Sequence, residues 1–274
     1  MAVINTNMAS LIAQKNLSKS GSSLSTSMER LSSGLRINSA KDDAAGQAIA
    51  NRMTAQIKGM AQAQRNANDG VSLVQTMEGG LSQINDNLQR IRELAVQAAS
   101  DTNTAADRTS ATTEIGERVA EIDRIAGSTK FNGTSLLSAA ATLNIQVGGN
   151  TSADDTISVS TVASTSTALG VAVAAVAVTD NTAAKAAITA VDAALTTLDT
   201  ARSTLGAKLN RFDSVVSNLQ TSETNLSAAR SRIQDADYAT EVASMTKSQI
   251  LQQAGTSVLA QANQSTQSVL KLLQ

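Results

Sequence analysis

The stretch LSSGLRINSAKDDAAG, residues 31–46, separates two segments with helical patterning. Leading into this stretch and over its first residues, apolar side chains recur at steps of three or four in two runs, as on one side of an amphipathic helix; they are Ile4, Met8 and Leu11, then Leu24, Met28, Leu31 and Leu35. Gly34 interrupts this stripe, because glycine disfavours a helix interior and often follows a helix end. The first helix is therefore predicted to end near Gly34.

A second helix is predicted to begin soon after that glycine. Asn38 and Ser39 are residues that cap helix starts, and Asp42 and Asp43 would then lie in the first turn, where the helix dipole favours acids. The whole stretch therefore predicts a hinge between two helices.

Bulky aromatic side chains are almost absent from these 274 residues, which contain two Phe, one Tyr and no Trp. This scarcity disfavours one compact globular core. The apolar content is mostly Ala, Leu, Ile and Val at helical spacing, so the composition favours thin helical bundles and an elongated shape.

The sequence has no Cys and no His. Disulfides, the usual zinc sites and His-dependent catalytic triads are therefore excluded. We expect no enzymatic activity, no catalytic residue, no metal site and no cofactor. The adjacent carboxylates Asp42–Asp43 and Asp154–Asp155 are assigned to a helix start and a turn.

The net charge of -1 gives no electrostatic reason to expect nucleic acid or an anionic membrane as a partner. No apolar run reaches the roughly 18 residues that a membrane-spanning helix needs. The first residues lack the basic start of a secretory signal peptide.

The clearest periodicity lies between residues 188 and 233, where apolar residues alternate at steps of three and four, as in a heptad seam. One helix over this stretch would extend on the order of 69 Å and would need partners. Residues 49–95 carry a matching stripe and are predicted to form one long helix despite Gly70, Gly79 and Gly80. A shorter helix is predicted over residues 113–126, ended by Gly127 and followed by a turn at residues 131–133.

A strand pattern replaces the helical one near residue 143. Leu143, Ile145 and Val147 alternate with polar residues, a Gly-Gly-Asn turn follows, and Ile157 and Val159 alternate again, which predicts a β-hairpin. Residues 161–182 are a low-complexity run of Ala, Val, Ser and Thr. We expect this run to form an exposed, variable tip.

A last amphipathic segment follows Val242, so both ends of the chain carry apolar stripes that one short helix cannot bury. The two ends are predicted to pair, and their combined apolar surface exceeds what two helices cover. The sequence therefore predicts assembly through the ends; the residues assigned to it are Ile4, Met8, Leu11, Leu251, Val258 and Leu273.

Several motifs resemble bacterial flagellins over essentially the whole chain. The N-terminal match is Ile4 to Asn7 together with residues 31–52. The others, in order, are residues 87–97, 121–124, 131–133, 143–147 and 229–238. Separated matches in the same order favour common ancestry over chance.

This resemblance implies a mainly α chain: an elongated, coiled-coil-like helical bundle with paired terminal helices, a small β-hairpin region and no large outer domains. Residues 1–42 and 234–274 would form the inner-tube domain. Residues 43–141 and 182–233 would form the rod domain, and residues 142–181 the hairpin and the variable region.

The resemblance also implies a function and a set of partners. The chain would be secreted unfolded through the flagellar type III apparatus and would polymerise with itself into an open helical filament for swimming, outside the cell. An export chaperone, a distal cap and hook-associated junction proteins would be partners. Residues matching the Toll-like receptor 5 surface of flagellins are Gln89, Arg90, Leu94 and Glu114. Hydroxyls placed for O-linked sugars are Ser158, Ser160, Thr161, Ser164, Thr165 and Ser166.

Two other functions fit part of the pattern. A hook-filament junction protein has similar helical ends, but the match at residues 31–46 favours a filament subunit. A secreted coiled-coil adhesin would not need apolar stripes at both termini.

Overall fold

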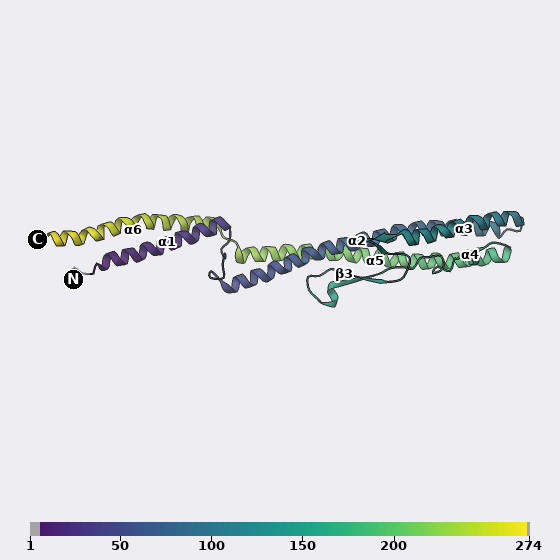
Figure 1. Cartoon of the computed structure of the whole chain (residues 1–274), viewed down its shortest axis with the longest axis horizontal. Coiled ribbons are helices and arrows are strands. Elements are labelled where there is room, and N and C mark those ends of the chain that lie inside the picture. The colour runs from purple at the N-terminus through teal and green to yellow at the C-terminus, as the bar shows by residue number, and fades with distance from the viewer. Residues whose placement is uncertain (1–5, 273–274) are drawn as a thin grey trace. The chain divides into compact units, whose positions relative to one another are not determined.

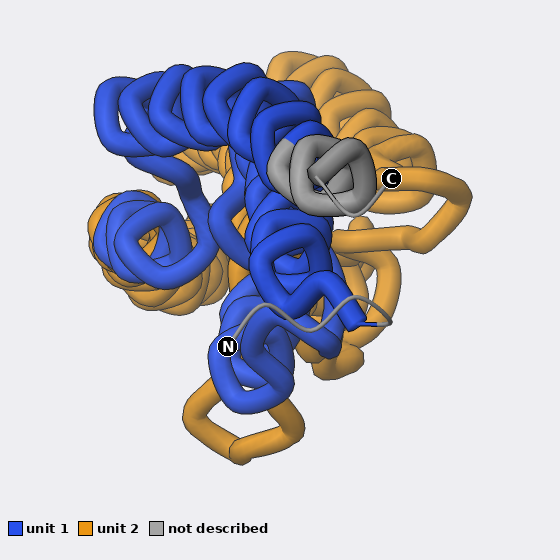
Figure 2. The backbone as a smooth tube through the Cα atoms, turned by 90° about the vertical axis from the view of Figure 1, so that its left-hand side faces the viewer, with its two compact units in different colours: residues 1–55, 224–274 blue, residues 56–223 orange. Residues whose placement is uncertain are grey.

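The computed structural model describes the backbone of residues 6–272 and the side chains of residues 6–264. Ile4 and Leu273, both assigned to assembly, lie outside the described residues. The chain divides into two compact units (Figure 2): unit 1 contains the described residues up to 55 and from 224 onward, and unit 2 contains residues 56–223.

Helices dominate both units. They are α1 (Met8–Ser33), α2 (Ala44–Ala98), α3 (Ala105–Ser128), α4 (Val173–Val176), α5 (Asn181–Gln234) and α6 (Tyr238–Leu272). Two short antiparallel strand pairs complete the fold: β1 (Lys130–Phe131) with β2 (Thr134–Ser135), and β3 (Thr142–Gln146) with β4 (Thr156–Ser160). The prediction of a mainly helical chain with a small hairpin region is confirmed.

The terminal helices α1 and α6 lie side by side in unit 1 (Figure 1). At one end of the pair, the Nδ2 amide of Asn7 donates to the carbonyl oxygen of Ala262 over 2.9 Å. At the other end, Arg30 and Glu241 form an ion pair of 3.0 Å. The two helices are therefore antiparallel, and the predicted pairing of the chain ends is confirmed.

The predicted hinge after α1 is also present. Gly34 adopts the left-handed conformation, with φ 71°, and its N–H donates to the carbonyl of Arg30, which ends the helix. The chain then crosses the segment between α5 and α6: Arg36 N donates to Gln234 O over 2.7 Å, and Ala236 N donates to Gly34 O over 2.9 Å. Backbone hydrogen bonds therefore join the two connecting segments of unit 1.

The predicted caps of α2 at Asn38 and Ser39 are wrong. The helix begins at Ala44, and the carboxylate of Asp43 accepts from Gly46 N over 2.9 Å, as an N-cap does. Asn38 and Ser39 instead donate their backbone N–H groups to Asp42. These hydrogen bonds, chiefly from Ser39, lower the pKa of Asp42 because they stabilise its charged form.

Unit 2 holds the hydrophobic core. The seam of α5 buries a residue every seven positions, at Val191, Leu198, Leu205, Phe212 and Leu219, as the heptad pattern predicts. From α2 the core takes Leu73, Val74, Met77, Leu81, Ile84, Leu88, Ile91 and Leu94, and from α3 Ile115, Val119, Ile122 and Ile125. The long helix predicted over residues 49–95 is confirmed as α2.

Helix α3 begins at Ala105, earlier than the predicted start at residue 113. Thr104 and Asp107 form a capping box that fixes this start, and the apolar stripe gave no sign of it. The helix also runs to Ser128, one residue past the glycine predicted to end it.

The predicted hairpin is confirmed as β3 and β4, with Leu143 opposite Val159 and Ile145 opposite Ile157. It lies against α2, where the Nδ2 amide of Asn66 donates to the carbonyl of Gln146 over 3.1 Å. Gly59 permits this close approach, because a Cβ there would lie 3.3 Å from the Cα of Gly149.

The expectation of an exposed tip at residues 161–182 is wrong for most of that run. Leu169, Val171, Val176 and Val178 are buried in the core of unit 2. Backbone groups hold the run in place: Ser164 N donates to Leu137 O over 2.8 Å, and Val178 N donates to the Thr112 hydroxyl. The segment therefore covers the core.

Two glycines of α2 give a matched test of this packing. A Cβ at Gly70 would lie 2.8 Å from the Phe212 ring, whereas a Cβ at Gly79 would have no neighbour within 4 Å. We expect Gly70→Ala to lower the free energy of unfolding by about 1–3 kcal/mol through overpacking. Gly79→Ala should raise it by roughly 0.5–1 kcal/mol through helix propensity. Urea unfolding measures both, and equal effects would contradict the packing described.

Candidate assembly interface

Large apolar side chains stand exposed on the terminal pair. Met8 is 59% exposed and Leu11 52% exposed on α1, and Leu251 is 48% and Val258 57% exposed on α6. The structure therefore brings these four predicted assembly residues together on one helix pair, with much of each side chain in solvent.

The pair covers little of its own apolar surface. Its buried positions are small or polar: Ala13 and Ser27 on α1, and Glu241, Ser248 and Ala262 on α6. Among the described side chains of unit 1, Ile37 is the one bulky apolar residue that is fully buried. Exposed apolar surface of this kind is typical of sites where proteins interact.

Sequence reasoning missed some members of this surface. Ile12 is 55% exposed and Ile250 59% exposed, and each is adjacent in sequence to an assigned residue. A stripe on one side of a helix includes only one of two consecutive residues, so it included Leu11 and Leu251 and left out their neighbours. The doublets themselves were the available signal, because two consecutive apolar residues on a helix face different directions.

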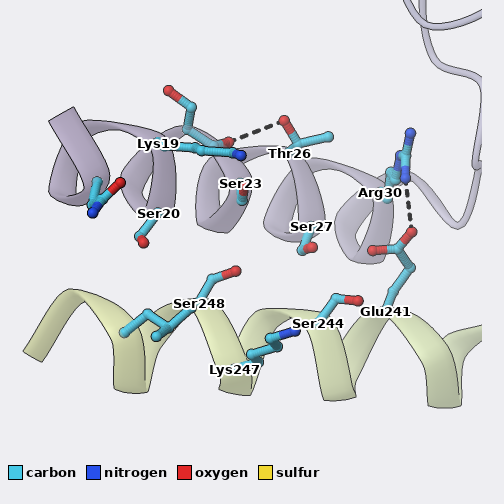
Figure 3. Close-up of a pocket in the computed structure, with 13 residues that line it drawn as sticks. Lys19, Ser20, Ser23, Thr26, Ser27, Arg30, Glu241, Ser244, Lys247 and Ser248 are labelled. Atoms are coloured by element: carbon cyan, nitrogen blue, oxygen red, sulfur yellow. Dashed lines mark hydrogen bonds and ion pairs between the residues drawn. The ribbon is translucent and has the colours of Figure 1, made fainter. Parts of the chain in front are cut away.

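A groove of about 790 Å³ opens between α1 and α6 (Figure 3). All of its lining residues except Leu251 have polar side chains; they are Asn16, Lys19, Ser20, Ser22, Ser23, Thr26, Ser27 and Arg30 of α1, with Glu241, Ser244, Lys247, Ser248 and Leu251 of α6. The Arg30–Glu241 ion pair lies at one end, with Arg30 30% and Glu241 11% exposed in their side chains. The Nε atom of Arg30 is buried and has no hydrogen-bond partner among the described residues.

The residues assigned to receptor binding lie on α2 and α3 of unit 2, and they do not all face solvent. Gln89 and Arg90 are exposed, and the Nε of Arg90 donates to Glu114 over 2.9 Å, joining the two helices. This hydrogen bond is the main cause of a raised pKa for Arg90 and a lowered pKa for Glu114. Leu94 is 4% exposed and belongs to the core.

The hydroxyls assigned to O-linked sugars divide in the same way. Ser158 and Ser160 are exposed on β4, and Thr165 is half-buried. Thr161, Ser164 and Ser166 are buried. The Ser166 hydroxyl donates to Asp123 over 2.7 Å, and the Thr161 hydroxyl donates to Ala139 O over 2.7 Å.

The described part of the chain lacks two other kinds of site. Residues 6–272 contain no helix that is both long and apolar enough to span a bilayer. In the same residues no three acidic, His or Cys side chains gather as ligands for a metal ion.

Known proteins match this chain over nearly its whole length. The family model for the bacterial flagellin N-terminal helical region matches residues 4–142, and the one for the C-terminal helical region matches residues 188–273. Flagellin of Serratia marcescens is 47% identical, with 99% of each chain covered. Flagellin of Xenorhabdus nematophila is 48% identical, with the same 99% coverage of both chains.

A solved structure shares the fold alone. It is described as a flagellar hook-associated protein from Vibrio parahaemolyticus, and it is 14% identical with a TM-score of 0.60 over 71% of this chain and 100% of that one. The sequence matches are far stronger and point to one family. The chain belongs to the bacterial flagellins, the structural proteins, not enzymes, that assemble into the extracellular filament of the flagellum.

Proposed function

We propose that this flagellin polymerises through its terminal unit, with α1 and α6 of each copy packing against those of other copies to form the inner tube of the filament. One observation carries this proposal. Met8, Leu11, Leu251 and Val258 are each about half exposed, and the buried positions of the same helix pair are small or polar. Covering the exposed half of each side chain is worth about 1 kcal/mol. Together they supply several kcal/mol for each copy that joins.

The remaining domains follow the same proposal. Residues 43–141 and 182–233 form the rod layer, and the segment between them contributes the hairpin. An open helical polymer requires heterologous contacts, in which different faces of one copy meet. The apolar side chains on both α1 and α6 support this, because they give the pair more than one face to offer.

We also propose the route by which the chain reaches the filament. It is exported unfolded through the flagellar type III apparatus, with a cytoplasmic chaperone on its C-terminal segment, and it folds under a distal cap next to hook-associated junction proteins. The absence of Cys and Pro supports this route, since neither disulfide exchange nor prolyl isomerisation slows refolding.

Receptor binding is a further proposal for unit 2. Gln89, Arg90 and Glu114 are accessible on α2 and α3 and match the surface by which flagellins engage Toll-like receptor 5. Leu94 supports that surface from within the core. Of the six hydroxyls assigned to O-linked sugars, Ser158 and Ser160 are exposed, so we propose them as the attachment sites.

The isolated monomer should have a weakly folded terminal unit. Because the described side chains of unit 1 bury so little apolar surface, residues 1–40 and 235–274 should exchange amide hydrogens quickly and become protected only in filaments. Residues of the α5 seam, such as Leu198 and Leu205, should be protected in both states. Strong protection of both chain ends in the monomer would contradict the proposal.

Single charges on the exposed stripe should stop assembly. We expect Leu251→Asp and Val258→Asp each to abolish seeded filament growth, since a carboxylate would be buried without a partner. The thermal melting of unit 2 should not change. Gln249→Asp is the control, because it adds the same charge to α6 at an exposed polar position. Normal filaments from both apolar-site variants would show that this stripe does not face another copy.

Receptor activation should depend on the ion pair that joins α2 and α3. Arg90→Ala with Glu114→Ala should weaken the Toll-like receptor 5 reporter response of monomeric protein at least about tenfold, because Arg often dominates interface energies. Arg124→Ala with Glu121→Ala removes another exposed ion pair of 2.6 Å and should leave the response unchanged. An unaltered response in the first variant would show that the motif match does not transfer to this chain.

A further inference from the structure

The turn between β1 and β2 contains the single Asn-Gly pair of the sequence, Asn132–Gly133. Phe131 lies opposite Thr134, so these two residues alone connect the strands. Both have positive φ angles, 47° at Asn132 and 81° at Gly133, as a type I′ turn requires. Asparagine and glycine adopt such angles more readily than other residues, which explains why the chain makes a tight hairpin at this point.

The reactive groups of this pair are accessible. Asn132 and Gly133 are both exposed, and the Asn132 side-chain amide forms no hydrogen bond with any residue that the structure describes. The N–H of Gly133 donates to no backbone carbonyl in the same part of the chain. A Cβ placed at Gly133 would have no neighbour within 4 Å, so the space beside this residue is open.

An accessible Asn-Gly pair can react with itself in water. The backbone nitrogen of Gly133 loses its proton and attacks Cγ of Asn132, the Cγ–Nδ2 bond breaks, and ammonia leaves with that proton. The product is a cyclic imide that contains the former Gly133 nitrogen. Glycine favours this step because it has no side chain to hinder the attack.

Water then opens the imide at either of its two carbonyls. Breaking the new bond between Cγ and the nitrogen gives aspartate at position 132. Breaking the bond between the main-chain carbonyl and the nitrogen gives isoaspartate, in which the main chain runs through Cγ and is lengthened by a methylene group. Either route consumes one water, releases one ammonia and needs no oxidant or reductant.

We propose that Asn132–Gly133 is a site of spontaneous deamidation, through which each copy of the protein acquires aspartate or isoaspartate in the β1–β2 turn as it ages. The inference is independent of assembly through unit 1, because the turn lies in unit 2 and its reaction needs no partner chain. A hairpin of two residue pairs is held by few hydrogen bonds, so it opens locally at little cost in free energy and lets the two groups meet.

The two products should affect the fold differently. Aspartate keeps the turn, because Asp-Gly forms the same turn type as Asn-Gly. Isoaspartate lengthens the main chain inside a two-residue loop, and the length of that loop sets the strand register. The residues that follow depend on this register: Leu136 and Leu137 are fully buried, and Leu136 N donates to Thr129 O over 3.1 Å.

Leu137 connects the turn to the segment that covers the core. Its carbonyl accepts from Ser164 N over 2.8 Å, and a Cβ at Gly80 of α2 would lie 2.7 Å from its side chain. A displacement of Leu137 would therefore weaken both its packing against α2 and the attachment of residues 161–178. Isoaspartate at position 132 should loosen that segment, whereas aspartate should leave it in place.

Peptide mapping of the folded protein tests the reaction. Asn150 is the internal control, because it is exposed and its side chain has no hydrogen bond among the described residues, but the β-branched Thr151 follows it. In mildly alkaline buffer, mass spectrometry should find deamidation at Asn132 at least about tenfold faster than at Asn150, since a branched side chain crowds the attacking nitrogen. Equal rates at the two sites would overturn the proposal.

Two further conditions test the mechanism. The rate at Asn132 should rise with pH, because the nitrogen of Gly133 reacts after losing its proton, and a rate that does not rise would contradict the cyclic imide. Urea-unfolded protein gives the rate without the turn. If Asn132 converts in unfolded protein and stays intact in folded protein over the same period, the turn protects it and the proposal is wrong.

The structural consequence is measured on the separated products. Ion exchange resolves them from unmodified protein because each gains a negative charge, and an isoaspartate-specific methyltransferase identifies the isoaspartate form. Hydrogen exchange over residues 161–178 should be severalfold faster in that form than in fresh protein. Asn132→Asp, which reproduces the other product, should exchange as fresh wild type does. Unchanged exchange in the isoaspartate form would show that the turn does not support the covering segment.

Asn132→Gly is the matched control for ageing. Glycine accepts the positive φ of this position and has no amide to react, so the variant keeps the turn and removes the chemistry. After the same incubation, residues 161–178 of this variant should exchange as they did at the start. If aged wild type and aged Asn132→Gly lose protection equally, another process causes the loss and deamidation at Asn132 does not.

Discussion

The burial of the α5 seam against α2 and α3 is the interaction on which the rest of this flagellin depends. Val191, Leu198, Leu205 and Phe212 recur every seven residues and are essentially inaccessible to solvent. Most side chains in this core are aliphatic, so the helices pack closely together. The Phe212 ring, for example, lies so near to Gly70 that a Cβ there would be 2.8 Å from it. Glycines inside α2 therefore serve the fold at the cost of some helix propensity.

Concentrating the bulky apolar side chains in unit 2 leaves the terminal unit without a core of its own. Its helix pair has serines in the seam and aliphatic side chains outside it, the reverse of a self-sufficient coiled coil. Two helices arranged in this way gain stability mainly from what covers them. In the assembly proposed above, the folding free energy of the terminal unit therefore depends on the concentration of other copies.

The sequence predicted those elements in which apolar residues recur at a regular spacing. The α5 seam, the long helix through Gly70 and the β3–β4 alternation each repeat often enough to outweigh a single unfavourable residue. Features fixed by one local hydrogen bond were missed: Asp43 caps α2 because Asn38 and Ser39 are engaged by Asp42 in the turn before it. No hydrophobic pattern distinguishes between neighbouring residues that can all cap a helix.

Residues 161–178 were misjudged for a different reason. Their Ala, Val, Ser and Thr side chains follow no period, and the contacts that bury them run through single groups such as Asp123, which accepts from both the N–H and the hydroxyl of Ser166. The family resemblance also failed to predict that Leu94 is buried. A motif gives residue identities without the direction in which each points, so a core leucine was grouped with exposed Arg90.

The likeness to a hook-associated structure helps to separate fold from role. At 14% identity the two chains share an architecture, and an architecture alone does not identify a protein's role. What distinguishes this chain must lie in side chains on that framework. Among the described residues, the terminal pair carries aliphatic doublets that face solvent and a groove lined by lysines and serines. Exposed aliphatic side chains gain nothing in a single copy, and in the proposed assembly they become favourable because different faces of identical copies cover one another at every step of the polymer.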